Sequence, residues 1–120
     1  MKYKTLTRNN DFRKAYSRGQ SFVSGALVTY VVKTKRGSMR VGITSSKKIG
    51  SAVARNRARR VIRAALRQVV PNPKAVSADI VFVARGCTAA KKSTQIEKIM
   101  YRHLVSAGVL PSDGAVKDVK

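Results

Sequence analysis

The stretch from Lys47 to Leu66 carries the side chains of this sequence that are best suited to bind an anion. It reads KKIGSAVARNRARRVIRAAL, with seven basic residues and no acidic residue. Guanidinium groups donate paired hydrogen bonds to phosphate groups and stack on nucleobases. Positive charges at this density repel one another within a helix. The stretch therefore predicts an anionic partner, and we expect the phosphate backbone of an RNA.

Helical periodicity divides these basic residues between two surfaces. With about 100° of rotation per residue, one apolar arc predicts the face toward the core: Ala54, Ala58, Val61, Ile62, Ala65 and Val69. A polar stripe points away from that core and comprises Arg55, Asn56, Arg59, Arg63 and Arg67. Arg60 and Arg57 turn progressively toward another side. The helix is therefore expected to offer two basic surfaces.

The charge pattern of this helix is unfavourable without a ligand. Like-charged pairs such as Arg55/Arg59 and Arg57/Arg60 cost about 0.2–0.5 kcal/mol each. Arg55 and Arg57 also occupy the first turn, where the helix dipole already concentrates positive potential. An anion bound by free backbone N–H groups and guanidinium groups would reverse both penalties. The alternative is a merely solvated basic face, whose cost the packing of the core could tolerate.

The overall composition also favours a polyanionic partner. The chain has 120 residues, a net charge of +21 and a pI near 11.4, and no carboxylate occurs from Phe12 to Ala78. Such a charge favours nucleic acid over an anionic membrane surface. We expect one RNA-binding domain over residues 1–120, with an ordered core at about 4–108 and a polar tail at 111–120.

Neither a membrane segment nor a metal site is expected. The N-terminal MKYKTLTRNN lacks the apolar region of a signal peptide, and no apolar run reaches the length of a transmembrane helix. Cys87 is the single cysteine and cannot form an internal disulfide, which fits the cytoplasm. Cys87 and His103 are the only soft metal ligands, so a zinc site is nearly excluded.

The first elements that are expected along the chain are a short helix and a strand. Asn10 is expected to cap a helix over residues 11–18, which ends at Gly19 in a left-handed conformation. Residues 22–33 have the composition of a strand, with a bulge or break at Gly25.

The middle of the chain predicts a hairpin followed by the long helix. A hairpin loop at 35–38 is expected to lead into a return strand over 39–45. Ser51 is a candidate cap for the basic helix, and Pro71 prevents its continuation.

The last elements complete an α+β fold. DIVFVAR, residues 79–85, is apolar on both faces, as a central strand is. Thr94 and Glu97 have the spacing of a capping box, and Gly108 is expected to end that helix. His103 lies in its apolar stripe and is interpreted as a core histidine with its hydrogen bonds satisfied. We expect a single-domain α/β sandwich of order αβββαβα, whose long helix crosses over between parallel strands.

Three aromatic residues are candidates for a surface on which RNA bases stack. Phe12 and Tyr16 lie four residues apart on one helix face, and Tyr30 lies in the following strand. Single-stranded nucleic acid is commonly bound by aromatic side chains beside a basic groove. The alternative for Phe12 and Tyr16 is that both belong to the core.

SKKIGSAVARNRARRVIRAAL, Ser46 to Leu66, closely resembles the signature of the bacterial ribonuclease P protein subunit, with its Arg-Asn-Arg core at Arg55 to Arg57. NNDFRKAYSRG is similar to the first helix of that family, MRVGITSSKKIG to its approach strand and DIVFVAR to its last strand. The resemblance covers residues 4–108.

The resemblance implies a fold, a partner and a division of the surface. The fold would be ribosomal protein S5 domain 2-like, with a left-handed βαβ crossover. The catalyst would be a large RNA that uses Mg2+ to remove the 5′ leader of precursor tRNA. The leader cleft would contain Phe12, Tyr16, Val28, Tyr30, Arg55, Asn56, Arg59 and Arg63. The catalytic RNA would be bound by Lys47, Lys48, Arg57 and Arg60.

No side chain is expected to be catalytic, and none to hold a metal. The five acidic residues are too few and too scattered for a two-metal site on the protein. Two other functions stay open on the residues alone: a basic ribosomal or RNA-chaperone protein, and a nuclease that needs no RNA. No DNA partner is expected.

Overall fold

The structure, a computed structural model, describes residues 3–35, 37–46 and 49–110. Its centre is a mixed five-stranded sheet with the strand order β1-β4-β5-β3-β2. β1 and β5 run parallel to β4 on its two sides, whereas β3 is antiparallel to both β5 and β2. The strands are β1 (Lys4–Thr5), β2 (Gln20–Val23), β3 (Leu27–Lys33), β4 (Met39–Ser45) and β5 (Ala78–Ala84).

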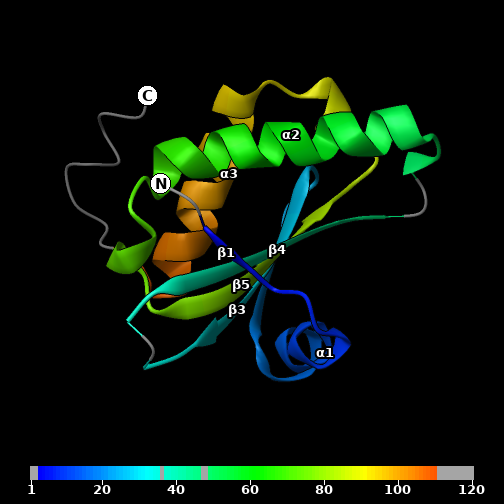
Figure 1. Cartoon of the computed structure of the whole chain (residues 1–120). Coiled ribbons are helices and arrows are strands. Elements are labelled where there is room, and N and C mark those ends of the chain that lie inside the picture. Colours follow the sequence, from blue (N-terminus) through cyan, green and yellow to red (C-terminus); the bar gives the residue numbers. More distant parts are fainter. Residues whose placement is uncertain (1–2, 36, 47–48, 111–120) are drawn as a thin grey trace.

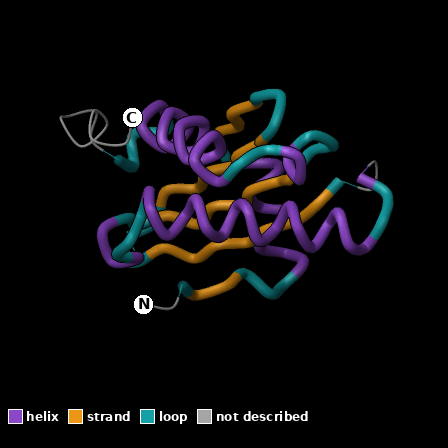
Figure 2. The backbone as a smooth tube through the Cα atoms, turned by 90° about the horizontal axis from the view of Figure 1, so that it is seen from above, coloured by secondary structure: helices purple, strands orange, loops and turns teal. Residues whose placement is uncertain are grey.

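Helices cover both faces of this sheet. They are α1 (Asn9–Arg18), α2 (Ala52–Val69) and α3 (Ser93–Ser106), with short 3-10 helices η2 (Pro73–Ala75) and η3 (Thr88–Ala90). α2 and α3 lie on one face and α1 on the other (Figure 1), and the view from above shows α2 and α3 over the strands (Figure 2). This confirms the α+β sandwich and the order αβββαβα, which the short β1 precedes. Among the described helices, none is long and apolar enough to cross a membrane.

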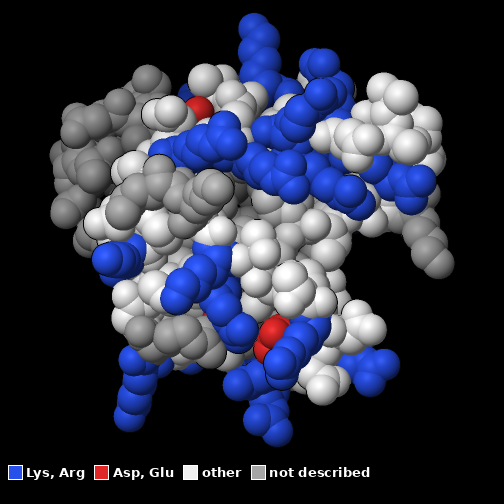
Figure 3. Space-filling view, in the orientation of Figure 1, with Lys and Arg blue, Asp and Glu red and all other residues white. Residues whose placement is uncertain are grey.

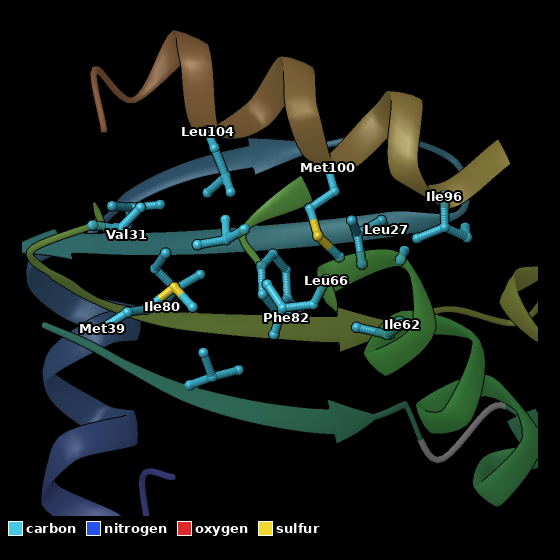
Figure 4. Close-up of a cluster of buried hydrophobic side chains, with 14 of the residues drawn as sticks. Leu27, Val31, Met39, Ile62, Leu66, Ile80, Phe82, Ile96, Met100 and Leu104 are labelled. Atoms are coloured by element: carbon cyan, nitrogen blue, oxygen red, sulfur yellow. The ribbon is translucent and has the colours of Figure 1, made fainter. Parts of the chain in front are cut away.

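The main core lies between the sheet and the two helices α2 and α3 (Figure 4). β5 is buried on both sides, because Ile80 and Phe82 pack in this core while Val81 packs in a smaller cluster under α1. The prediction of a central strand is thereby confirmed. Ile62 on α2 is fully buried as predicted, and so is Leu66, which the predicted apolar arc had omitted.

The ends of α2 follow from its sequence. The Ser51 hydroxyl accepts a hydrogen bond from the Ala54 N–H at 3.1 Å, which confirms the predicted cap. The helix ends at Val69, directly before the segment that contains Pro71. α2 connects β4 to β5, and these two strands are parallel neighbours, as the predicted crossover requires.

The predicted hairpin at residues 35–38 is wrong. β3 and β4 do not pair, because β5 is inserted between them. The connection instead follows the start of β5, where the Thr34 N–H bonds the Ser77 carbonyl at 3.1 Å. The hairpin lies earlier in the chain: Gly25 is in a tight turn between β2 and β3, closed by backbone bonds between Ser24 and Leu27.

Of the four predicted helix ends outside α2, the structure confirms only the stop at Gly108 in full. α1 is capped by Arg8 and begins at Asn9, one residue before the predicted cap Asn10. α1 ends at Arg18, directly before Gly19, as predicted, but Gly19 has an extended backbone with φ of −74° and not a left-handed one.

α3 begins at Ser93, before the predicted Thr94–Glu97 capping box, and the Lys92 N–H bonds Gln95 Oε1 at 2.9 Å. The predicted stop at Gly108 is correct. Its φ of +79° closes the helix with a bond from the Val109 N–H to the Leu104 carbonyl at 3.1 Å.

Candidate RNA interface

Basic side chains form a band along α2 on the surface of the molecule (Figure 3). Four arginines of this band are exposed, Arg57, Arg60, Arg63 and Arg67, and so is the neighbouring Asn56. Arg55 and Arg59 are half-buried. The first turn of α2 contains no acidic residue, so the positive end of the helix dipole is unopposed there. The predicted ligand-binding helix is therefore formed and accessible to a polyanion.

Arg59 reaches from α2 toward the end of β4. Its Nη2 lies 3.4 Å from Ser45 Oγ. Its Nε is buried and has no hydrogen-bond partner among the residues that the structure describes. A buried donor without an acceptor is unfavourable, so an acceptor supplied by a ligand at this position would stabilise the guanidinium.

Arg57 reaches in another direction. Its Nε donates a hydrogen bond of 2.8 Å to the Ala89 carbonyl in η3. Arg57 and Arg59 are two residues apart but contact different elements, η3 and β4. The structure thus separates the two basic surfaces at the residues where the helical periodicity separates them.

Tyr16 of α1 and Tyr30 of β3 form an edge-to-face aromatic pair. Their ring centroids are 4.9 Å apart and their planes are inclined by 80°. Tyr16 is 45% exposed, and Tyr30 is half-buried. Val28 shares the sheet face of Tyr30 but is buried, so it offers little surface to a ligand. Neither tyrosine is confined to the core.

Phe12 meets the basic helix at a cavity of about 450 Å³ between α2, β4 and the N-terminal segment. The side chains around it include Tyr3, Leu6, Phe12, Val41, Arg63 and Arg67. The structure thus brings Phe12 and Arg63 together, as the predicted cleft requires. Sequence reasoning missed the contribution of Tyr3 and Leu6, because the parallel pairing of β1 with β4 is a long-range contact without a local signal.

Arg40 connects α1 to the sheet through two of the chain's acidic residues. Its Nε and Nη2 donate hydrogen bonds to the two carboxylate oxygens of Asp79 at 2.9 and 2.7 Å. Its Nη2 also lies 3.4 Å from Asp11 in the first turn of α1. The hydrogen bond to Asp79 raises the pKa of Arg40 above its ordinary value. Sequence reasoning missed this network, although the scarcity of acidic residues was a signal.

His103 is a core histidine, as predicted. Its Nε2 lies 2.8 Å from Ser24 Oγ and its Nδ1 lies 2.8 Å from Thr29 Oγ1. Burial, and secondarily the charge of Arg102, lowers the pKa of His103 to about 4. The imidazole is therefore neutral at pH 7 and adds no charge to the basic surface of α2.

The remaining site predictions concern Lys47, Lys48 and metal ligands. Lys47 and Lys48 lie outside the described residues. Within the described ranges, no three His, Cys, Asp or Glu side chains are grouped so that they could hold a metal ion. Cys87 is exposed and lies just after β5, as expected of a small residue near a strand end.

The sequence and the fold are similar to those of known proteins. A family model described as Ribonuclease P matches residues 1–108. A ribonuclease P protein component of Clostridioides difficile is 46% identical over 68% of this chain and 72% of its own length. One of Clostridium botulinum is 34% identical over 91% of this chain and 98% of its own. The structure of the RNase P protein of Staphylococcus aureus superposes with a TM-score of 0.75 at 30% identity, covering 92% of this chain and all of that one.

Proposed function

The chain belongs to the ribonuclease P protein family, and on this premise we propose how its surfaces share the binding of RNA. It is a subunit of the ribonuclease P holoenzyme, an endoribonuclease, and assists the processing of the 5′ leader of precursor tRNA. This membership replaces both alternatives, the ribosomal or RNA-chaperone protein and the nuclease that needs no RNA.

One surface binds the 5′ leader. It combines residues of α1 and β3 with polar residues of α2, and the buried Val28 supports the Tyr30 face from beneath. The proposed set is Phe12, Tyr16, Val28, Tyr30, Arg55, Asn56, Arg59 and Arg63. The partnerless Nε of Arg59 supports this proposal, because a leader phosphate would supply the missing acceptor. The exposed Tyr16 ring beside Tyr30 supplies an aromatic face on which a leader base can stack.

The other surface binds the catalytic RNA. Arg57 and Arg60 are exposed on α2, and we add Lys47 and Lys48 in the segment before the helix. The observation that carries this division is the divergence of Arg57, bonded to η3, from Arg59, directed at β4. Two RNAs can thereby be bound along one helix without competing for the same guanidinium groups.

The protein supplies binding, and the RNA supplies the reaction. Asp11 and Asp79 lie near each other, but both are occupied by Arg40, so they do not fit a protein-borne magnesium site. We therefore place the Mg2+ ions mainly on the catalytic RNA and assign no catalytic side chain. The expected location is the cytoplasm, where the precursor tRNA is made.

A pair of substitutions tests the division of the surfaces. In the reconstituted holoenzyme, Arg59→Ala and Tyr30→Ala should weaken the binding of precursor tRNA with a long leader about five- to tenfold. The binding of mature tRNA should change much less. Arg57→Ala should instead weaken assembly with the catalytic RNA. The measurement is the equilibrium Kd of each complex at fixed salt.

Tyr30→Phe is the matched control, because it retains the ring and should bind the leader nearly as the wild type does. If Arg59→Ala weakens mature and precursor tRNA equally, the leader is not bound at this surface. If Arg57→Ala and Arg59→Ala act alike, the proposed division is wrong.

A further inference from the structure

The cavity of about 450 Å³ extends beyond the proposed leader surface. Among the residues that the structure describes, Phe12 and Arg63 are the two that belong to both the cavity and the leader surface. Its other walls come from Tyr3, Thr5 and Leu6 in the N-terminal segment and from neighbouring residues of β4 and α2. No acidic residue of the described part of the chain lines it, and Arg63 and Arg67 supply its positive charge. In Figure 3, uncharged surface lies between the basic band of α2 and α1.

Tyr3 closes one end of this cavity. Its hydroxyl donates a hydrogen bond to the carbonyl of Val70 and lies 3.3 Å from the carbonyl of Leu66, so it supplies a donor at the C-terminal end of α2. Burial raises the pKa of the Tyr3 hydroxyl, and the neighbouring Arg67 acts in the opposite sense. The N-terminal segment is thereby fastened to α2 at one wall of the cavity.

The Phe12 ring and Gly42 of β4 lie together in the lining of the cavity. A Cβ atom at Gly42 would lie 2.5 Å from Phe12 Cε1 and 2.7 Å from Cζ, so the ring rests directly on the backbone of β4. β1 pairs with β4 only at Arg40 and Val41 in the described part of the chain. The Leu6 N–H bonds the Val41 carbonyl at 3.0 Å, and strand alternation directs the backbone of Ile43 to the same edge.

These properties match one nucleotide. The aromatic ring of Phe12 suits a planar base, the backbone of Ile43 offers a donor and an acceptor to the edge of that base, and Arg63 and Arg67 suit the adjoining phosphates. An acidic peptide would satisfy the arginines but would not need the Phe12 ring beside them. The positions of Arg59, Arg63 and Arg67 follow one another at about 6 Å along the axis of α2. A strand bound at Arg59 therefore continues to the cavity.

We propose that this cavity binds one unstacked base of the 5′ leader, with its flanking phosphates on Arg63 and Arg67. The proposal rests on the proposed function, because it extends the leader surface by one further subsite. The base is recognised by its planar face and its edge. Its distance from the cleavage point depends on the direction in which the leader runs along α2.

The test uses the reconstituted holoenzyme and precursor tRNAs that carry a single abasic nucleotide at successive leader positions. With the wild-type chain, the abasic nucleotide should weaken binding about five- to tenfold at the position that fills the cavity. Thr5→Trp should fill the cavity from an exposed wall and abolish the effect of that position. Lys4→Trp is the matched control, because Lys4 is the exposed neighbour that does not line the cavity.

A second pair of variants avoids any change of shape. Arg67→Gln should weaken the binding of long-leader precursor several-fold, whereas Lys98→Gln removes the same charge from an exposed position of α3 that does not line the cavity and should not weaken it. If Thr5→Trp and Lys4→Trp behave alike while Arg59→Ala still weakens leader binding, the subsite is wrong and the proposed function stands. If Thr5→Trp weakens assembly with the catalytic RNA instead, the occupant is not the leader. If no variant of either surface depends on the leader, the proposed function itself fails.

Discussion

His103 is the buried polar residue whose protonation should affect the stability of this chain most. It is 6% exposed and stacks on Phe22 with a centroid distance of 5.9 Å. Two hydroxyl groups, from Ser24 and Thr29, occupy both ring nitrogens. Because a neutral imidazole has one donor and one acceptor, the two hydroxyls can complement it fully. The site is therefore built for the neutral ring.

Stability should consequently fall in mild acid. The pKa of His103 is about 4 in the folded chain and about 6.5 when unfolded, so the unfolded state binds the proton first as the pH falls. Above pH 6.5 the residue has no effect, and between pH 6.5 and 4 the free energy of unfolding should decrease by up to about 3 kcal/mol. Urea denaturation at a series of pH values measures this change.

His103→Gln provides the comparison, since glutamine can bond both hydroxyls but does not titrate. It should be less stable than the wild type at pH 7 and should lose less stability between pH 6.5 and 4. Parallel pH profiles of the two proteins would show that another group is responsible.

At the scale of elements, the contact between α1 and the sheet decides where the aromatic residues lie. α1 has 10 residues, and Ala15 is its only fully buried side chain. The Arg40 guanidinium adds a polar contact to this small apolar one, with Asp79 as the close partner and Asp11 as the distant one. The position of Phe12 and Tyr16 over the sheet therefore depends on charges that lie outside the RNA surface.

We expect Asp79→Asn to destabilise the chain by about 1–3 kcal/mol, because it leaves Arg40 half-buried without its paired carboxylate. Asp11→Asn should cost less than about 1 kcal/mol, because that contact is longer and more exposed. Chemical denaturation measures both values. Equal effects of the two substitutions would contradict the dominant role of Asp79.

The elements were largely predictable, whereas their pairing was not. The strand over 39–45, the cap at Ser51 and the stop at Gly108 are each encoded by a local pattern, and the structure confirms all three. The insertion of β5 between β3 and β4 has no local signal, so the hairpin prediction failed. For the same reason the sequence indicated the basic residues of α2 but not the cavity that β1 completes beside them.

For the molecule as a whole, the net charge of +21 opposes the folding of the free chain but favours the binding of RNA. Repulsion between like charges weakens the compact free chain, and added salt screens it. Binding of RNA releases counterions, so added salt weakens the complex.

Raising NaCl from about 50 to 200 mM should therefore increase the Tm of the free chain while it lowers its affinity for RNA. With six phosphates contacted on a single strand, log Kd should change with log salt by about 4 units per decade. Thermal melts and binding titrations in the same buffers measure the two effects. A Tm that falls with salt, or an affinity that does not, would contradict this account.

The insertion of β5 between β3 and β4 has a consequence for synthesis on the ribosome. β3 and β4 both pair with a strand that ends at Ala84, so a nascent chain that stops before β5 cannot close its sheet. The arginines of α2 emerge before β5, which is one of the strands on which their helix packs. During this interval the most basic segment of the chain is unsupported and surrounded by ribosomal RNA. The order of the strands thus sets a period in which this nascent chain is exposed to the wrong RNA.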